Sequence, residues 1–351
     1  MSGRGKGVQR SWPARAGRLA LLLIVQAAIV LGLLEILGRV IDPLGISYYP
    51  ETAAYLDTLI REEPIGYRNA PNLEGRFWGA PVRINSLGMR DREVPQTPAE
   101  NEFRLMVMGD SLPFGIGVGD EETIPRRLEE LLNKEHAGPL RFRALNMGVP
   151  SYNTEQQSIQ LQTLGLSLHP DVVILFFVRN DLESKMWVLE KREKWLVDKA
   201  QRSYASCLLV VLLRQVRQAL GLRDMRFGEE RYEPSNPRWV ATESALGEIH
   251  RICRDAGVPF VLFPVYGPKV PHLLAALEDV GRREGFPVIN IWPWSIEQKP
   301  QFENSMTDSH PNAEGSKLVA AALYEGLRRA GVLPDGLATS SQGEVADATK
   351  P

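Results

Sequence analysis

The chain has 351 residues, 44% of them hydrophobic and 24% charged, which is a composition typical of a globular protein with one or two large cores. Its 41 lysines and arginines nearly balance its 43 aspartates and glutamates, so the overall charge gives no indication of nucleic-acid binding. The only cysteines, Cys207 and Cys253, are too few for a disulfide framework or a recognisable metal site. They form one disulfide or, as we expect, remain two buried thiols.

The N-terminus combines a basic segment with an apolar one. Residues 1–18 carry five lysines and arginines, and residues 19–41 are interrupted only by Gln26, Glu35 and Arg39. The length and the basic flank predict a transmembrane signal-anchor helix with residues 1–18 in the cytoplasm. A cleaved signal peptide and a buried helix of a soluble domain are the alternatives; the first usually has a shorter apolar core and a small-residue cleavage site. Either export interpretation places the rest of the chain outside the cytoplasm.

Residues 42–102 are predicted to form an extended arm. They include seven prolines, a density that excludes a long helix. We expect short extended pieces joined by turns, packed on the main domain with their charges in solvent.

From residue 103 onward, apolar runs alternate with amphipathic segments. The runs are continuous, as expected of strands buried on both faces, and they cover residues 103–109, 141–147, 171–178, 258–264 and 287–291. Helices are predicted between them, one starting at Thr154 with a capping box to Gln157. The repeat of strand and helix predicts an α/β fold for residues 103–334, a three-layer α/β/α domain with a mainly parallel five-stranded sheet.

Two segments fall outside this repeat. Residues 182–240 form a helical insertion that is a cap over the site, a helix on the membrane surface or an additional packed helix. Residues 335–351 are small and polar, which is typical of a disordered tail.

Polar residues follow the predicted strands at the sheet edge where ligands bind in parallel α/β folds. A serine acts as a nucleophile when a base removes its proton and an acid orients that base. We therefore expect Ser111 as nucleophile, His310 as base and Asp308 as its partner. The donors for a developing oxyanion are then the backbone N–H groups of Ser111 and Gly148 and the side-chain amide of Asn180.

Each of these residues alone has an ordinary structural explanation, such as a turn, a helix cap or a solvated histidine. His272, after the fourth strand, is a rival base. The joint position of the five candidates at successive strand ends favours a catalytic site; they are Ser111, Gly148, Asn180, Asp308 and His310.

Four segments in this order resemble the SGNH, or GDSL-type, hydrolases: "VMGDSLPFGIGV", "NMGVPSYNT", "FFVRND" and "DSHPNAEG". The resemblance covers about residues 103–330 and implies a flavodoxin-like sheet and the same roles for the five candidate residues. "INSLGMRDRE" in the arm is similar to bacterial, membrane-anchored members. This chain has Val178 where the family usually has glycine, and His310 is two positions after Asp308 rather than three.

The resulting hypothesis is a serine esterase that hydrolyses an O-acyl ester on a cell-envelope glycan or lipid. It is held at the bacterial inner membrane by its N-terminal helix, with the catalytic domain on the periplasmic side. The alternatives are a glycan O-acetyltransferase using the same site and a catalytically silent glycan-binding protein. No metal cluster, phosphate loop or dinucleotide fingerprint is visible, so no cofactor is expected.

Overall fold

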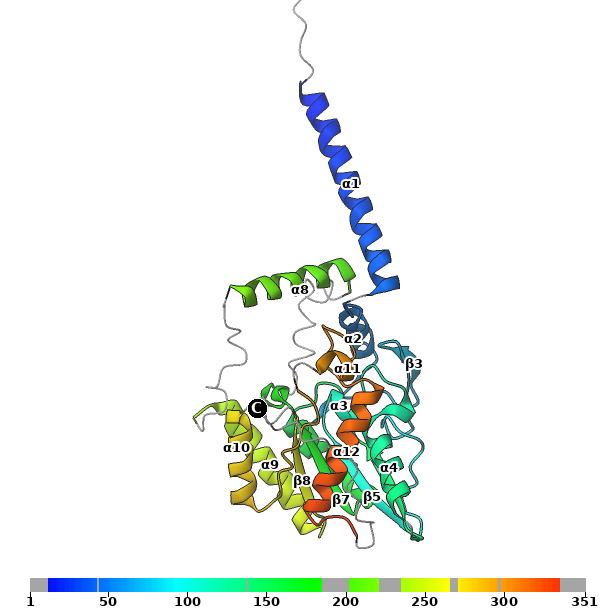
Figure 1. Ribbon diagram of the computed structural model, residues 1–351, viewed down its shortest axis with the longest axis vertical. Helices are drawn as coiled ribbons and strands as arrows, with labels where there is room; N and C mark the ends of the chain where they lie inside the picture. The colour runs from blue at the N-terminus through cyan, green and yellow to red at the C-terminus, as the bar shows by residue number, and fades with distance from the viewer. Residues whose placement is uncertain are drawn as a thin grey trace, which may run out of the picture.

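The computed structural model in Figure 1 describes residues 12–42, 44–136, 138–184, 202–220, 235–265, 271–295 and 298–334. The predictions for the tail, for most of the basic N-terminus and for much of the insertion lie outside these residues. One long helix, α1 (Trp12–Ile41), extends away from an α/β body.

Four parallel strands form the central sheet, in the order β6-β5-β7-β8. These strands are β5 (Glu102–Met108), β6 (Arg141–Asn146), β7 (Val172–Phe177) and β8 (Phe260–Pro264). The parallel α/β fold predicted from the sequence is confirmed.

The fifth predicted strand, residues 287–291, is reduced to one parallel bridge between Leu262 and Val288. Leu262 N–H donates to the Pro287 carbonyl at 3.0 Å, and Ile289 N–H donates to the Leu262 carbonyl at 2.8 Å. The next donors of a parallel ladder would be Pro264 and Pro287, which have no N–H. The sheet therefore has four full strands rather than five.

Helices cover both faces of the sheet, which makes three layers. Alternate residues of each strand point to opposite faces, so Met106 and Leu105 of β5 belong to different cores. One core contains α5 (Thr154–Thr163), α9 (Pro237–Asp255) and α10 (Pro271–Glu284), and the other contains α4 (Ile124–Glu135) and α12 (Ala313–Arg329). The capping box of α5 joins Asn153 and Gln156, one residue earlier than predicted, because the Asn153 side chain accepts from the Gln156 N–H.

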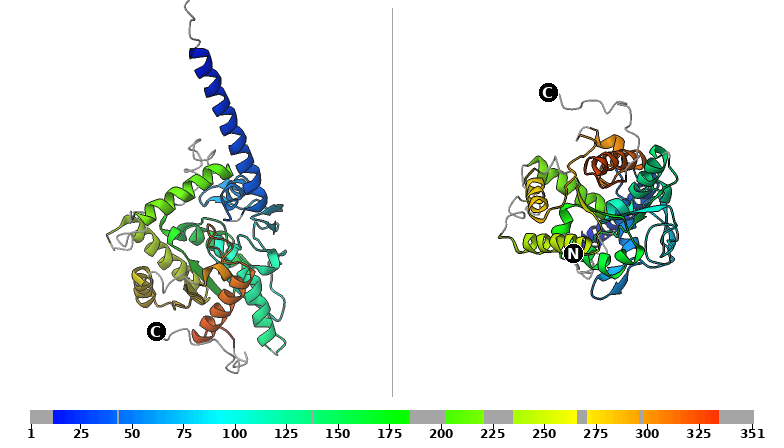
Figure 2. Two further views of the ribbon diagram at one scale, coloured as in Figure 1. Left: turned by 45° about the horizontal axis from the view of Figure 1, so that its top comes forward. Right: turned by 90° about the horizontal axis from the view of Figure 1, so that it is seen from below.

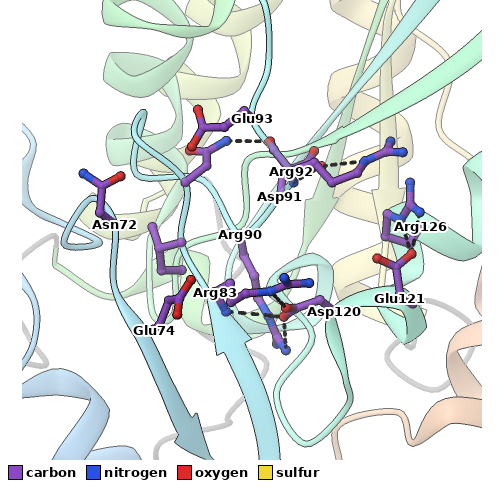
Figure 3. Close-up of a pocket in the computed structure, with 12 residues that line it drawn as sticks. Asn72, Glu74, Arg83, Arg90, Asp91, Arg92, Glu93, Asp120, Glu121 and Arg126 are labelled. Carbon is purple, nitrogen blue, oxygen red and sulfur yellow. Dashed lines mark hydrogen bonds and ion pairs between the residues drawn. The ribbon is translucent and has the colours of Figure 1, made fainter.

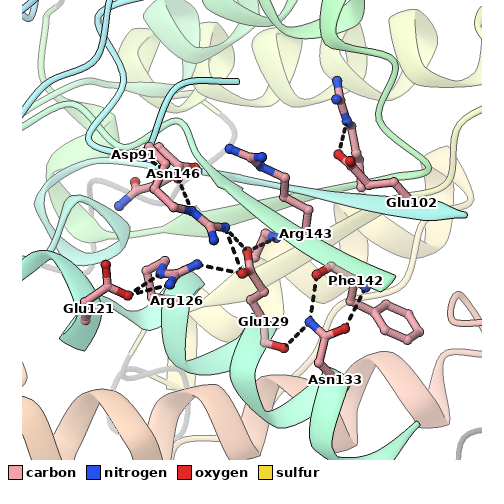
Figure 4. A network of polar contacts seen from close by, with 12 residues as sticks. Asp91, Glu102, Glu121, Arg126, Glu129, Asn133, Phe142, Arg143 and Asn146 are labelled. Carbon is pink, nitrogen blue, oxygen red and sulfur yellow. Dashed lines mark hydrogen bonds and ion pairs between the residues drawn. The ribbon is translucent and has the colours of Figure 1, made fainter. Parts of the chain in front are cut away.

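Side chains cover the edge of the sheet at β6, where backbone donors would otherwise remain unpaired (Figure 4). The N–H groups of Phe142, Ala144 and Asn146 donate in turn to Asn133 at 3.0 Å, Glu129 at 3.1 Å and Asp91 at 3.1 Å. Burial raises the pKa of Asp91 to about 6, although the N–H donors favour its charged form.

The arm consists of one short helix and two hairpins that pack on the body. The elements are α2 (Tyr48–Leu56), β1 (Ile60–Glu62) paired with β2 (Gly66–Arg68), and β3 (Glu74–Phe77) paired with β4 (Ala80–Arg83). Tyr55 and Trp78 of the arm pack against Phe114, three residues after Ser111. The arm thus supports the turn that carries the predicted nucleophile.

Within residues 16–41 of α1, the most apolar stretch of 18 residues has a mean hydropathy of 2.6 and no buried residue. This segment is long and apolar enough to cross a membrane. Glu35 and Arg39 form an ion pair at 2.6 Å near its end.

Candidate active site

Ser111 is the first residue of the short helix α3 (Ser111–Phe114), three residues past the end of β5. Asp110 caps this helix by accepting from the Leu112 N–H at 3.2 Å. The turn between strand and helix leaves the Ser111 side chain partly exposed and its backbone N–H without a partner among the described residues. The buried strand β5 therefore positions the partly exposed Ser111 hydroxyl close to a backbone N–H that has no partner among the described residues.

His310 approaches this serine from the loop between α11 (Lys299–Phe302) and α12. Its Nε2 lies 2.7 Å from Ser111 Oγ, and its Nδ1 lies 2.5 Å from Asp308 Oδ1. An Nδ1–H that donates to Asp308 leaves the Nε2 lone pair directed at the serine hydroxyl. The structure thus joins Ser111, His310 and Asp308 in one hydrogen-bonded chain, while the rival base His272 is exposed at the start of α10.

Asn304, which the sequence analysis missed, holds the other oxygen of Asp308. Its side-chain amide donates to Asp308 Oδ2 at 3.0 Å and to the Ile116 carbonyl at 2.9 Å. Its backbone N–H donates to the His310 carbonyl at 2.9 Å. Asn304 therefore fixes the loop that carries both Asp308 and His310.

Asn180 lies in the 3₁₀ turn η3 (Arg179–Leu182) after β7. One N–H of its side chain donates to Asp110 Oδ2 at 3.0 Å, so its second N–H remains available to a ligand. Ser111 Oγ lies 3.1 Å from the same Asp110 oxygen. Asp110 thus positions the Asn180 amide next to the serine, a role that the sequence analysis did not assign.

Val178 replaces the glycine usual in the family without strain. Its φ is −126° and its ψ is 164°, an extended conformation open to any residue, and its side chain is buried in a core. The Val178 N–H donates to the buried Asp181 at 2.7 Å, which fixes the turn.

Gly148 is placed beside the nucleophile, but its N–H is already engaged. It donates to Asn146 Oδ1 at 3.0 Å. A Cβ at this position would lie 2.3 Å from the Phe114 nitrogen and 3.0 Å from the Asp110 carbonyl oxygen, so only glycine fits. Among the described residues, the Ser111 N–H and one Asn180 N–H therefore have no acceptor, whereas the third predicted donor, the Gly148 N–H, already has one.

The electrostatics of the site stabilise the positive charge that the His310 imidazole carries after it accepts a proton. Burial lowers the pKa of His310, but the adjacent Asp308 carboxylate, with help from Asp110, more than offsets this, and the pKa is raised above its ordinary value. Burial also raises the pKa of Asp110 and of Asp181, and the pKa of Asp181 rises further because Asp110 lies nearby.

The arm forms one wall of the site. The ring of Tyr48 lies against that of His310, with centroids 5.7 Å apart. Thr307 is in the same loop as His310. Its hydroxyl Oγ1 lies within hydrogen-bonding distance of two carbonyl oxygens, at 2.9 Å from that of Leu44 and 2.7 Å from that of Gly45. Gly45 has a φ of +70°, and a Cβ there would lie 2.0 Å from Ser305 Oγ. The segment that follows α1 is therefore fitted closely to the loop of Asp308 and His310.

A separate cavity of about 380 Å³ lies between the arm and the body (Figure 3). Contrary to the expectation of solvated arm charges, the Arg90 side chain is completely buried there. Its guanidinium contacts Asp120 at 3.1 Å and donates to the carbonyls of Phe114 at 3.2 Å and Val118 at 2.7 Å. This cavity does not include the predicted site residues.

Neither cysteine nor any acidic cluster provides a metal site in the described part of the chain. Cys207 and Cys253 are both buried, and no disulfide joins them. The described residues hold no group of three His, Cys, Asp or Glu side chains able to bind a metal ion.

The sequence matches the GDSL-like lipase/acylhydrolase family over residues 107–318, and the chain belongs to this family of ester hydrolases. Solved structures with a similar chain include TesA (14% identity, covering 66% of this chain and 99% of that one, TM-score 0.43). Others are the esterase EstA from Pseudoalteromonas sp. (14%, 64% and 97%, 0.42) and a two-domain esterase active on acetylated mannans (15%, 71% and 54%, 0.43). No curated protein matches the chain.

Proposed function

We propose that this protein is a serine esterase that hydrolyses O-acyl esters with Ser111 as nucleophile. The observation that carries the proposal is the hydrogen-bonded chain from Ser111 Oγ through the His310 imidazole to Asp308. In this series of hydrogen bonds, the His310 imidazole is oriented to accept the proton of the Ser111 hydroxyl, which is what activation of an alcohol requires.

In the first half-reaction, Ser111 Oγ bonds to the ester carbonyl carbon while its proton passes to His310 Nε2. The negative charge then forms on the former carbonyl oxygen, where the Ser111 N–H and the second Asn180 N–H stabilise it. The Gly148 N–H joins them by sharing its hydrogen between Asn146 and the oxyanion. The C–O bond to the leaving alcohol breaks as His310 returns the proton to that alcohol.

In the second half-reaction, water attacks the acyl-serine carbonyl and His310 takes a proton from the water. The bond to Ser111 breaks, the serine regains its proton, and the carboxylic acid leaves. Replacement of water by a sugar hydroxyl would make the same site an O-acyltransferase. An assay with an acetyl ester, with and without an oligosaccharide, separates the two by whether acetate or acetylated sugar forms.

The proposed setting is the outer face of a bacterial inner membrane, with α1 as an uncleaved anchor. The length of residues 16–41 and the mean hydropathy of 2.6 of their most apolar 18-residue stretch support this setting, as does the basic segment at the N-terminus. The proposed substrate is then an acylated glycan or lipid of the cell envelope.

A fluorophosphonate probe tests the nucleophile in the detergent-solubilised full chain. The unmodified protein and the control Ser167→Ala, at an exposed serine of η2 (Gly165–Leu168), should both become labelled. Ser111→Ala should resist labelling and lose ester hydrolysis by roughly 10⁵-fold or more, as expected when a nucleophile is removed. Equal labelling of Ser111→Ala and the unmodified protein would contradict the proposal.

A further inference from the structure

The helix α8 (Tyr204–Ala219), within the insertion, has two sides of different character. One side is buried: Tyr204 and Cys207 pack against the arm, and Val211 is buried as well. Apolar side chains on the other side are 43–69% exposed and recur every three or four residues: Leu209, Val210, Leu212, Leu213, Val216 and, just past the helix, Leu220. We call these six residues the apolar face of α8.

The start of α8 is joined to the end of α1 by specific contacts. Glu35 of α1 accepts from the N–H groups of Tyr204 and Ala205, both at 3.0 Å, and from Ser203 Oγ at 3.1 Å. These contacts place a carboxylate on free donors at a helix N-terminus, where negative charge is favoured. Arg39 of α1 also donates to the Arg202 carbonyl at 2.7 Å.

The two helices also touch closely. The ring of Tyr204 lies on Gly38, where a Cβ would approach a ring carbon to 2.3 Å. Figures 1 and 2 both show α8 running crosswise to α1 from this joint. When α1 stands along a membrane normal, α8 therefore runs close to the membrane plane.

We propose that the apolar face of α8 lies in the lipid interface of the same membrane that α1 crosses. This inference rests on the proposed anchoring of the chain by α1. The bilayer is the occupant favoured over a second copy because α8 starts beside the end of α1, where Leu37, Val40 and Ile41 are also exposed apolar side chains. Helices with one apolar side that lie in the membrane plane bury that side at the boundary of headgroups and acyl chains.

The chain thus contacts the membrane at two places: a spanning helix and an in-plane helix. Because α8 packs on the arm through Tyr204 and Cys207, its insertion restricts the tilt of the body relative to the membrane. The proposed esterase would then have a fixed orientation rather than rotating freely about a single anchor.

Depth-dependent quenching tests this arrangement in the full chain reconstituted into phosphatidylcholine vesicles. An environment-sensitive fluorophore is attached to Leu213→Cys or, separately, to Val216→Cys, two exposed positions of the apolar face. Val240→Cys on α9 is the matched control, since Val240 is also an exposed apolar side chain at 50%. The parent chain, whose two cysteines are buried, measures background labelling.

The expected result is that nitroxide on the lipid acyl chains removes most of the fluorescence at positions 213 and 216 and little at 240, with aqueous iodide giving the reverse. Iodide quenching at 213 and 216 would show that the face is in water and overturn the inference. Protection from both quenchers would show a protein on this face and also overturn it. Retention on the vesicles through carbonate extraction reports α1 separately; loss of the chain in that step overturns the anchoring and the inference together.

Discussion

Buried charged side chains occur both in the cavity between the arm and the body and at the sheet edge that carries Ser111, but only the second region is suited to the proposed chemistry. In the cavity between the arm and the body, each of the four arginines that line it has a carboxylate partner within 3.1 Å. At the sheet edge, Ser111 faces the imidazole of His310, and Asn180 retains a spare N–H. The proposed site is therefore not identified by cavity volume or by charge density. It is identified by hydrogen-bonding groups that remain available beside the Ser111 hydroxyl.

Removal of the charge on Asp308 should have the largest effect and should leave the fold intact. In Asp308→Asn the imidazole loses the partner that sets its tautomer, and kcat should fall about 10⁴-fold, as in other serine hydrolases with this change. Kinetics with a short acyl ester measure the loss, and thermal unfolding checks that stability is unchanged. An active variant would show that this bond does not orient the base.

The same variant should also move the pH profile. In the unmodified chain the pKa of His310 is raised, so kcat/KM should increase with pH through a midpoint above the ordinary histidine value of about 6.5. Without the Asp308 charge, the effect of burial dominates and the midpoint of the residual activity should fall. An unchanged or higher midpoint would contradict this assignment.

The opposite behaviour is expected for the cavity. Arg90→Met removes a fully buried guanidinium and leaves backbone carbonyls without donors, so the free energy of unfolding should fall by roughly 3–5 kcal/mol. Arg83→Met is the matched control, since Arg83 pairs with the same Asp120 but is 63% exposed, and it should cost at most about 1 kcal/mol.

Denaturant unfolding measures both changes, and the activity per folded molecule should stay close to that of the unmodified chain. Equal destabilisation by the two variants would show that burial of Arg90 contributes nothing beyond an exposed ion pair.

Asn180→Ala should lower turnover less than Asp308→Asn does. The loss of one oxyanion donor should lower kcat about 10²–10³-fold, with KM nearly unchanged, because the donor acts on charge that forms in the transition state. A change in KM alone would instead indicate that Asn180 binds the ground state of the substrate.

The sequence predicted the positions of the site residues better than the bonds between them. Ser111, Asn180 and His310 could be located because parallel strands bring their carboxyl ends to one edge, whatever the intervening loops do. Asn304 could not, since an asparagine in a loop has no pattern that distinguishes it from a turn residue. The engagement of the Gly148 N–H by Asn146 also depends on a side-chain rotamer that no spacing encodes.

Some features of the fold could likewise be predicted from the sequence, and others could not. Continuous apolar runs predicted the four strands of the sheet, because a strand that is buried on both faces has apolar residues at successive positions. The run at 287–291 also contains Val288, Ile289 and Ile291, yet its ladder ends at Pro264 and Pro287. The burial of Arg90 in the arm was missed because an arginine paired with carbonyl oxygens has the same sequence signature as one in solvent.

The close fit between the segment after α1 and the loop of His310 has a consequence for how substrate is encountered. Tyr48, whose ring lies against His310, follows the end of α1 at Ile41 by a stretch of chain that spans at most about 25 Å. With α1 in a bilayer, the imidazole is confined to a thin layer above the lipid surface. Molecules that diffuse laterally in that layer reach it by a two-dimensional search, whereas freely dissolved molecules must find it from the whole volume.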